Sequence, residues 1–159
     1  MINIYGEIFL GDINDCSKAP PNLYVIHACK HPCHQVAVGY SGRLPKESPY
    51  YLFMKKDKHL YLNMVDMTCT VPSHEFMSVL FKESLDFLSE IKGKKVLIHC
   101  NKGQSRSPMI ALLYLSKIEG VIPSDTYDNA KKEFVNRIYR GYNPSAGTEQ
   151  YIKMYWEKL

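Results

Sequence analysis

The sequence lacks any long hydrophobic segment. Its longest uninterrupted apolar run extends from Met109 to Leu115, far short of the roughly 20 residues that a membrane-spanning helix needs. The first residues contain no basic segment followed by an apolar one, which is the pattern of a secretory signal peptide. The sequence also contains no internal repeat and no low-complexity tract. We therefore expect a cytoplasmic protein without a membrane span.

Cysteine content and net charge are both low. The five cysteines are odd in number and irregularly spaced, which is not typical of a disulfide framework and favours a reducing compartment. The formal charge of +4 suits an anionic substrate without requiring nucleic acid. With 159 residues, 45% of them hydrophobic, the chain can build one core. We expect a single domain over residues 1–159, and a monomer.

One stretch, residues 96–108, combines the features of a strand, a loop and the start of a helix. Val96 to Ile98 is a short aliphatic run typical of a buried strand. Pro108 occupies a position that the first turn of a helix tolerates, and apolar helix formers follow it. Between them lie Cys100 and Arg106, with five residues separating the two. The pattern predicts a loop that leads into the N-terminus of a helix.

The predicted loop has the chemistry of a phosphate site with a nucleophile. Its backbone N–H groups can point inward at the positive end of the helix, where they would bind a phosphate. The same field and the guanidinium of Arg106 would lower the pKa of Cys100 and favour its thiolate. Arg106 also offers two parallel donors to phosphoryl oxygens. Gly103 gives the loop the freedom of a tight turn, and Ser107 can donate a hydrogen bond to the sulfur.

Two other interpretations of this stretch can be compared with the first. A buried structural cysteine beside an unrelated arginine would give the same spacing, because a Cys-x5-Arg pair alone is a weak signal. The neighbouring His99, Gly103 and Ser107, together with the order strand, loop, helix, argue against that interpretation. A Walker-type nucleotide loop is excluded, because the sequence contains no Gly-x4-Gly-Lys-Ser/Thr.

The motif His99-Cys100-x-x-Gly103-x-Ser105-Arg106-Ser107 resembles the signature of the cysteine-dependent phosphatases, in its dual-specificity form. The resemblance implies an α/β fold, a central mixed sheet flanked by helices, with Cys100 at the carboxyl end of a central strand. It implies that the Cys100 thiolate attacks phosphorus, and that no metal or cofactor is required. The phosphate would be bound by the loop residues Asn101, Lys102, Gly103, Gln104, Ser105 and Arg106.

The resemblance also indicates a general acid. An alternating apolar run from Leu60 ends at Asp66, which precedes Cys100 by 34 positions and resembles the family's strand-end acid. Residues 67–72 would then form a mobile loop that lets the carboxyl group reach the leaving oxygen. The alternative is an Asp that only forms a turn or caps a helix. Asp57 is a poorer candidate for the acid, because it lies in a lysine-rich run before the strand.

Residues 29–48 show no period and predict a loop. In the family this segment borders the substrate pocket, which makes four of its residues candidates for substrate contact; a variable surface loop is the alternative. A metal site built from Cys29, His31, Cys33 and His34 is not expected, because no second pair at structural zinc spacing follows. The substrate-contact candidates are Lys30, His31, His34 and Arg43.

Alternation, turn residues and helical spacing outline the rest of the fold. They predict an edge hairpin at the N-terminus, a buried strand before the segment 29–48, and a long helix that delivers the chain to Val96. Three further helices follow the loop, and Trp156 is expected to anchor the core. The predicted ranges are the hairpin from Ile2 to Leu10, the strand from Leu23 to Ala28, and helices from Ser73 to Gly93, Met109 to Glu119, Ser124 to Ile138 and Gln150 to Leu159.

Two residues beside the nucleophile have predicted supporting roles. His99 precedes Cys100 on a strand and so should point to the opposite face, where its imidazole would bond to backbone and hold the loop. Cys29 ends a strand at the place where several members of the superfamily carry a second cysteine behind the catalytic one. It could therefore capture an oxidised Cys100 as a disulfide. The alternative is that Cys29 is a small buried side chain without a partner.

The function expected from the resemblance is hydrolysis of phosphomonoesters. Phosphotyrosine in proteins is the first expectation, with phosphoserine and phosphothreonine as further substrates. Lys102 adds a charge that could favour a phosphoinositide or an RNA 5′-phosphate, although the sequence shows no RNA-binding stripe. A phosphopeptide-binding pseudophosphatase is an alternative of another class. The intact nucleophile argues against it, because a binding module needs none.

Overall fold

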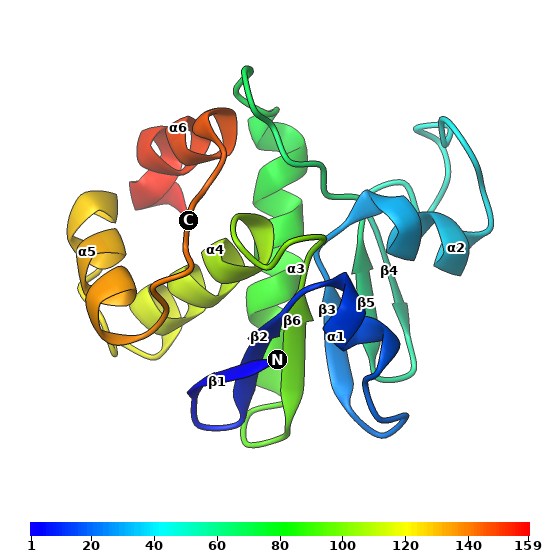
Figure 1. Cartoon of the computed structure of the whole chain (residues 1–159). Helices are drawn as coiled ribbons and strands as arrows, with labels where there is room; N and C mark the ends of the chain where they lie inside the picture. Colours follow the sequence, from blue (N-terminus) through cyan, green and yellow to red (C-terminus); the bar gives the residue numbers. More distant parts are fainter.

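The computed structural model describes all 159 residues and contains one six-stranded sheet flanked by helices (Figure 1). In spatial order the strands are β1, β2, β6, β3, β5 and β4. The four inner strands are parallel, and each edge strand pairs antiparallel with its neighbour. The predicted α/β fold with a mixed sheet is confirmed. The strands are β1 Ile2–Tyr5, β2 Ile8–Gly11, β3 Tyr24–His27, β4 Phe53–Lys56, β5 His59–Leu62 and β6 Val96–His99.

Six α-helices connect and cover the strands. Capping side chains explain two of their starts: the Asp12 carboxylate accepts the N–H groups of Asn14 and Asp15, and the Thr126 hydroxyl accepts that of Asn129. None of the helices combines the length and the apolar character that crossing a membrane requires. The helices are α1 Ile13–Ser17, α2 Gln35–Val38, α3 His74–Glu90, α4 Arg106–Leu113, α5 Tyr127–Arg137 and α6 Ala146–Tyr155, and the further helical turns are η1 Lys30–His34, η2 Tyr114–Ile118 and η3 Trp156–Lys158.

The two faces of the sheet are covered unequally. Alternate residues of the strands, such as Leu10, Ile26 and Ile98, join the helices α3 and α4 in a cluster of 30 buried residues, which includes Trp156 as predicted. On the other face Val25 and Leu97 belong to a cluster of only three buried residues. Because side chains alternate along a strand, His27 and His99 project from this second face. That face therefore carries polar groups near the ends of β3 and β6.

Several sequence predictions about local structure were wrong. Residues 29–48 are not entirely irregular, because η1 and α2 lie within them. The N-terminal hairpin does not lie wholly at the edge, since β2 pairs on its other side with β6. The strand expected to reach Asp66 ends at Leu62. The penultimate helix begins after Thr126 and not at Ser124, and the last begins at Ala146, since Ser145 can take the extended conformation of an N-cap.

Candidate active site

The loop from Cys100 to Arg106 joins β6 to α4 at the carboxyl end of the parallel strands. The last residue of β6, His99, lies opposite Gly11 of β2 and His27 of β3. The backbone N–H of Ala28 donates to the carbonyl oxygen of His99 at 2.8 Å and ties two strand ends together just before the loop. Open parallel sheets bind ligands outside this edge. The fold therefore places the loop where a ligand site is expected.

The thiol of Cys100 is stabilised as a thiolate. Its side chain is buried, with 1% of its surface exposed, and burial acts to raise the pKa of the thiol. The Ser107 hydroxyl donates to the sulfur at 3.2 Å, and further contributions come from backbone N–H groups and the charge of Arg106. Together they outweigh burial and lower the pKa of Cys100 below its ordinary value. Ser107 thus stands where the sequence predicts a donor to the sulfur.

Replacing Ser107 should move this titration in a defined direction. In Ser107→Ala the thiolate loses a hydrogen bond that favours its charged form, so the pKa of Cys100 should rise and its alkylation by iodoacetamide should shift to higher pH. Peptide mapping of the alkylated protein as a function of pH separates Cys100 from the other cysteines. Ser116→Ala is the matched control, because that hydroxyl donates to Pro123 instead. An unchanged Cys100 profile in Ser107→Ala would contradict the role of the hydroxyl.

Arg106 is held by two hydrogen bonds, and its third donor group makes none. It is buried, with 7% of its surface exposed. One terminal nitrogen donates to the Met64 carbonyl oxygen at 3.1 Å, and the other donates to the Asn101 side-chain oxygen at 2.6 Å. The Nε atom is buried and has no hydrogen-bond partner in the protein. Buried N–H groups are almost always paired, so this donor indicates a site for an anion.

Asp66 lies beside this arginine. It belongs to the loop after β5, and its Oδ2 is 3.9 Å from the Arg106 Nε. Its Oδ1 accepts a hydrogen bond from the Ser105 hydroxyl at 2.9 Å and another from the Ser145 hydroxyl. About a third of the side chain is exposed, at 34%. The structure thus brings Asp66 to the edge of the loop with one face open to a ligand.

The segment after Asp66 is attached to the C-terminal part of the chain. The Met67 N–H donates to the Thr148 hydroxyl, and the Thr148 N–H donates to the Met67 carbonyl, both at 3.2 Å. A side chain at Gly147 would come within 2.1 Å of the Thr70 carbonyl oxygen, so the two backbones are in direct contact. If residues 67–72 move as predicted, these contacts must break.

The C-terminal segment also braces the phosphate loop. The Tyr139 hydroxyl donates to the Gly103 carbonyl at 2.9 Å, and the Asn143 N–H donates to the Gln104 carbonyl at 2.8 Å. The Ser145 N–H donates to the Ser105 hydroxyl at 3.1 Å. Sequence reasoning missed these supporting residues. Their only signal was the turn-rich segment Asn143-Pro144-Ser145-Ala146-Gly147, which marks an irregular segment but not its position.

Gly103 is required at its position for two reasons. Its φ of +68° lies in the left-handed region, and a Cβ would come within 2.9 Å of the Gly11 carbonyl oxygen. The loop therefore packs directly on the end of β2, as a glycine at this position allows. Lys102 and Gln104 on either side are exposed, so their side chains can meet a substrate.

The substrate-contact candidates of residues 29–48 do not behave alike. The His31 carbonyl accepts from the Asn101 side chain at 3.0 Å, so this segment reaches the phosphate loop. His34 is fully buried and bonds to the Tyr40 hydroxyl and the Tyr50 carbonyl, both at 2.9 Å. The prediction that His34 contacts substrate is wrong, because the ring holds its own segment together. Lys30 is half-buried and Arg43 is exposed.

The two supporting residues predicted beside Cys100 occupy the same region. Cys29 is buried, and a hydrogen bond with the Cys33 thiol lowers the pKa of Cys29 to about 7. Its capture of an oxidised Cys100 stays a prediction. The His99 Nδ1 faces the Cys100 carbonyl oxygen at 3.4 Å, which is the backbone contact expected of it. Its other nitrogen faces His27 and Cys33.

Known proteins match this chain in sequence. A family model described as dual specificity phosphatase, catalytic domain, matches residues 25–142. Dual specificity protein phosphatase 5 of Homo sapiens is 37% identical over 67 residues, which are 41% of this chain and 16% of that protein. A probable rhodanese domain-containing dual specificity protein phosphatase of Dictyostelium discoideum is 32% identical over 82 residues, 49% of this chain and 17% of that protein. The chain thus spans less than a fifth of these curated relatives.

Solved structures share the fold. A human tyrosine phosphatase-like serine/threonine/tyrosine-interacting protein superposes with a TM-score of 0.65 at 21% identity, covering 98% of this chain and 95% of that one. The structure of PTPMT1 in complex with PI(5)P superposes with a TM-score of 0.59 at 17% identity, covering 97% and 92% of the two chains. At such low sequence identities the similarity shows only that the fold is shared.

Proposed function

Because the chain belongs to the dual specificity phosphatase family, we propose that it hydrolyses phosphomonoesters in proteins, phosphotyrosine first and phosphoserine and phosphothreonine as well. The observation that carries the proposal is the buried Nε of Arg106, which makes no hydrogen bond. It lies in the same loop as a cysteine whose pKa is lowered by the Ser107 hydrogen bond acting against burial. An anion site and a thiolate in one loop suit attack on a phosphate.

The first step transfers the phosphoryl group to sulfur. The Cys100 thiolate attacks phosphorus while the loop N–H groups and Arg106 bind the equatorial oxygens. The P–O bond to the leaving group breaks, and Asp66 donates a proton to the departing oxygen. Asp66 is suited to this because its open side lies beside the guanidinium that would hold the phosphate.

The second step returns the enzyme to its starting state. Asp66, now a carboxylate, accepts a proton from water as the water oxygen attacks the cysteinyl-phosphate. The P–S bond breaks and the electron pair returns to sulfur. The Ser107 hydroxyl, 3.2 Å from that sulfur, stabilises the thiolate as it leaves. Neither step requires a group beyond these side chains and water.

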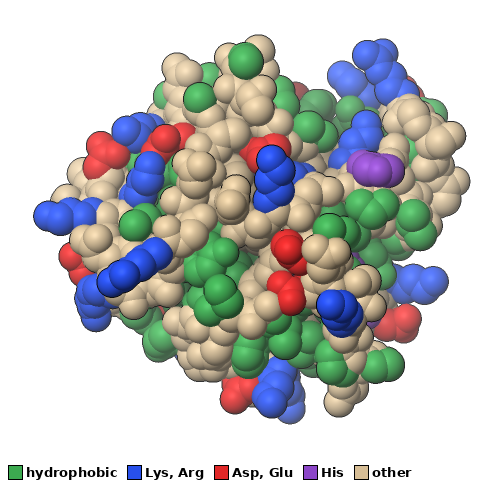
Figure 2. Space-filling model, in the orientation of Figure 1, with side chains coloured by type: hydrophobic (Ala, Val, Ile, Leu, Met, Phe, Trp, Pro, Cys, Tyr) green, Lys and Arg blue, Asp and Glu red, His purple; other side chains and the backbone are tan.

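Surface charge favours a phosphoprotein over a polyanionic substrate. Lys102 is the only basic side chain of the loop besides Arg106. On the face shown in Figure 2, lysine and arginine side chains are scattered, with acidic side chains among them. A phosphoinositide or an RNA 5′ end would be better bound by a continuous basic surface.

We further propose that the protein acts in the cytoplasm, where reducing conditions suit its five free cysteines. We propose that it acts there as a monomer.

A substrate panel tests this preference. Phosphotyrosine, phosphoserine and phosphothreonine peptides should be hydrolysed with a higher kcat/KM than soluble phosphoinositides or 5′-triphosphorylated RNA. One structural neighbour was solved in complex with PI(5)P, so a phosphoinositide is the specific alternative. A higher kcat/KM for PI(5)P than for every peptide would show that the preferred substrate is a lipid and not a protein.

A second alternative is binding without turnover. One structural neighbour is a tyrosine phosphatase-like interacting protein, so the fold alone does not establish catalysis. In this chain Cys100, Ser107 and Arg106 are all present: the Ser107 hydroxyl donates to the Cys100 sulfur, and the charge of Arg106 helps to lower the pKa of Cys100. Hydrolysis of p-nitrophenyl phosphate is therefore expected. Binding of phosphotyrosine peptides without any hydrolysis would establish the alternative.

Asp66→Asn should separate substrates by their leaving groups. The variant cannot protonate the departing oxygen, so kcat should fall by about 10²–10⁴-fold for substrates with poor leaving groups. Aryl phosphates with very good leaving groups should be affected much less. Steady-state kinetics on a series of aryl phosphates measures this dependence.

The matched control for Asp66→Asn is Asp57→Asn. Asp57 has a φ of +54°, a conformation that asparagine tolerates, so the control should fold and keep its activity. An equal loss for good and poor leaving groups in Asp66→Asn would show that Asp66 is not the general acid.

A further inference from the structure

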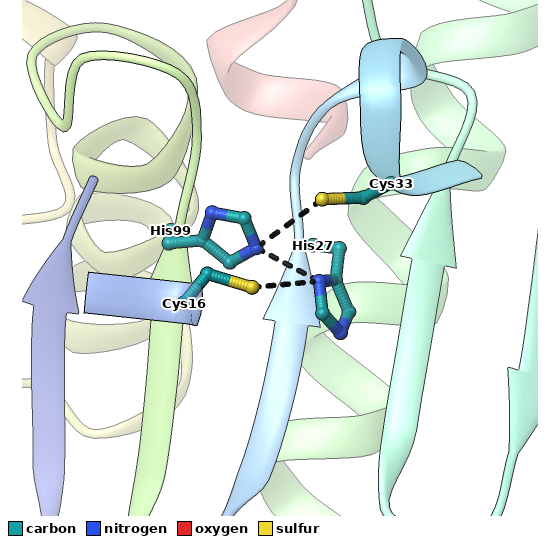
Figure 3. Close-up of side chains that lie close together, drawn as sticks. All are labelled: Cys16, His27, Cys33 and His99. Carbon is teal, nitrogen blue, oxygen red and sulfur yellow. Dashed lines mark hydrogen bonds between the residues drawn. The ribbon is translucent and has the colours of Figure 1, made fainter. Parts of the chain in front are cut away.

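Four side chains from distant parts of the sequence meet on the face of the sheet opposite the main core. Cys16 comes from α1, His27 from the end of β3, Cys33 from η1 and His99 from the end of β6 (Figure 3). One nitrogen or sulfur atom of each lies within 4.8 Å of the corresponding atoms of the other three. The two histidines are buried and the two cysteines are half-buried. The proposed reaction uses none of these four side chains as a chemical group.

The spacing of these atoms suits one tetrahedral ion. The Cys16 sulfur is 3.6 Å from the His27 Nδ1, and the Cys33 sulfur is 3.8 Å from the His99 Nε2. In a zinc site with Zn–S near 2.3 Å and Zn–N near 2.0 Å, a sulfur and a nitrogen lie about 3.5 Å apart. The two nitrogens, 2.8 Å apart, would have to separate by roughly half an ångström to reach tetrahedral spacing.

The remaining ring nitrogens have acceptors that a metal site requires. The His27 Nε2 lies 2.9 Å from the His59 Nδ1, and the His99 Nδ1 lies 3.4 Å from the Cys100 carbonyl oxygen. Metal-bound histidines usually donate their second N–H to such a partner, which fixes the ring and its tautomer. His59 also stacks on His27, with ring centroids 5.2 Å apart. Both histidines are thus oriented with one nitrogen toward the shared centre.

We propose that Cys16, His27, Cys33 and His99 bind one zinc ion as a Cys2His2 site. Two thiolates and two imidazoles fill a tetrahedral shell and leave no open position, which is typical of a structural site and not of a catalytic one. The absence of carboxylates from the four donors disfavours magnesium and calcium, which take oxygen ligands.

The ion would link the active-site loop to three other segments. His99 immediately precedes Cys100, and Cys33 lies in the segment whose His31 carbonyl accepts from Asn101. Two thiolates balance the charge of a divalent ion, so its field at Cys100 would be small. The site would therefore act by holding the ends of β3 and β6 in place. Its loss should lower stability more than it changes the pKa of Cys100.

Cobalt titration of the full chain tests the site directly. The Cys100→Ser background is used, because the catalytic thiolate could itself bind a divalent ion. After removal of metal under reducing conditions, one Co²⁺ per chain should give the intense visible bands of a tetrahedral ion and a thiolate charge-transfer band. One equivalent of Zn²⁺ should then abolish both. A chain that gives no such bands, or only those of octahedral cobalt, would overturn the proposal.

Variants identify the ligands. Cys33→Ser should lose part of the charge-transfer intensity, because only the Cys16 thiolate remains, and should bind zinc far more weakly, whereas Cys69→Ser, at an exposed cysteine, should titrate as the parent does. His59→Ala should weaken zinc binding about 10–100-fold, and His59→Gln, which keeps an acceptor, should recover most of it. Full binding in Cys33→Ser, or a loss in Cys69→Ser, would place the metal elsewhere and refute the site.

Thermal unfolding of the chain without substitutions is a further test, and it does not require any variant to fold. Zinc should raise its Tm, since an ion bound only to the folded state stabilises it, and a chelator should reverse the increase. Without an ion, the four side chains would be held together by hydrogen bonds that share protons or by a Cys16–Cys33 disulfide. An unchanged Tm with zinc, or that disulfide in protein prepared under reductant, would show that one of these holds the cluster together.

Discussion

Cys100→Ser should abolish turnover while the protein still binds phosphate. A serine hydroxyl is not ionised at neutral pH, so the variant lacks the nucleophile that the lowered pKa of Cys100 provides. The rate should fall by about 10⁴-fold or more, the scale seen when a nucleophile is removed from an enzyme. Arg106 is held by Met64 and Asn101 and not by the cysteine, so the anion site should survive. Steady-state hydrolysis of p-nitrophenyl phosphate and calorimetric binding of a phosphotyrosine peptide measure the two effects.

Cys69→Ser is the control for this experiment. Cys69 lies in the segment after Asp66, but it is exposed and its sulfur contacts the Thr68 hydroxyl, so its substitution removes a thiol without touching the phosphate loop. It should leave both kcat and peptide affinity unchanged. Activity of Cys100→Ser within tenfold of the unaltered chain would refute Cys100 as the nucleophile. Loss of peptide affinity together with activity would show instead that the thiolate itself organises the loop.

The sequence predicted the parts of the molecule that depend on short-range patterns. Val96 to Ile98 is apolar throughout because β6 is buried on both faces, and its position beside a Cys-to-Arg loop indicates the carboxyl edge of a parallel sheet. Gly103 was expected from turn geometry, and its φ of +68° agrees. Ser107 was expected to reach the sulfur, and it lies 3.2 Å away. These features follow from residues that are neighbours in sequence.

The parts that were missed depend on contacts between distant segments. His34 resembles a surface histidine in a loop, yet it is buried because two hydrogen bonds close residues 34–50 around it. Ser145 supports Asp66 from 79 positions away, a contact that no local pattern encodes. Spacing in the sequence can indicate a metal site only where the ligands are close together along the chain. The cluster in the structure combines Cys33 with side chains from three other elements, so its spacing follows no sequence motif.

Arg106→Lys should be nearly as damaging as loss of the nucleophile, although it preserves the charge. The guanidinium makes two fixed hydrogen bonds, to the Met64 carbonyl and the Asn101 side chain, and still has Nε for an anion. A lysine has a single nitrogen, which cannot reproduce that planar set of donors. Loss of one such donor to a transition state costs about 10²–10³-fold in kcat, so a fall of that size or greater is expected.

Comparing kcat, Tm and phosphate binding in Arg106→Lys distinguishes a catalytic role of the arginine from a structural one. Arg137→Lys is the control, because Arg137 is exposed and pairs with Glu133, an ion pair that lysine can keep. It should leave kcat and Tm unchanged. In Arg106→Lys, lost contacts to Met64 and Asn101 should also lower Tm, so phosphate protection against alkylation of Cys100 provides an independent measure of anion binding. If Tm falls while kcat and phosphate protection stay near normal, the arginine only supports the loop. If both kcat and phosphate protection collapse, Nε binds the phosphate that Cys100 attacks.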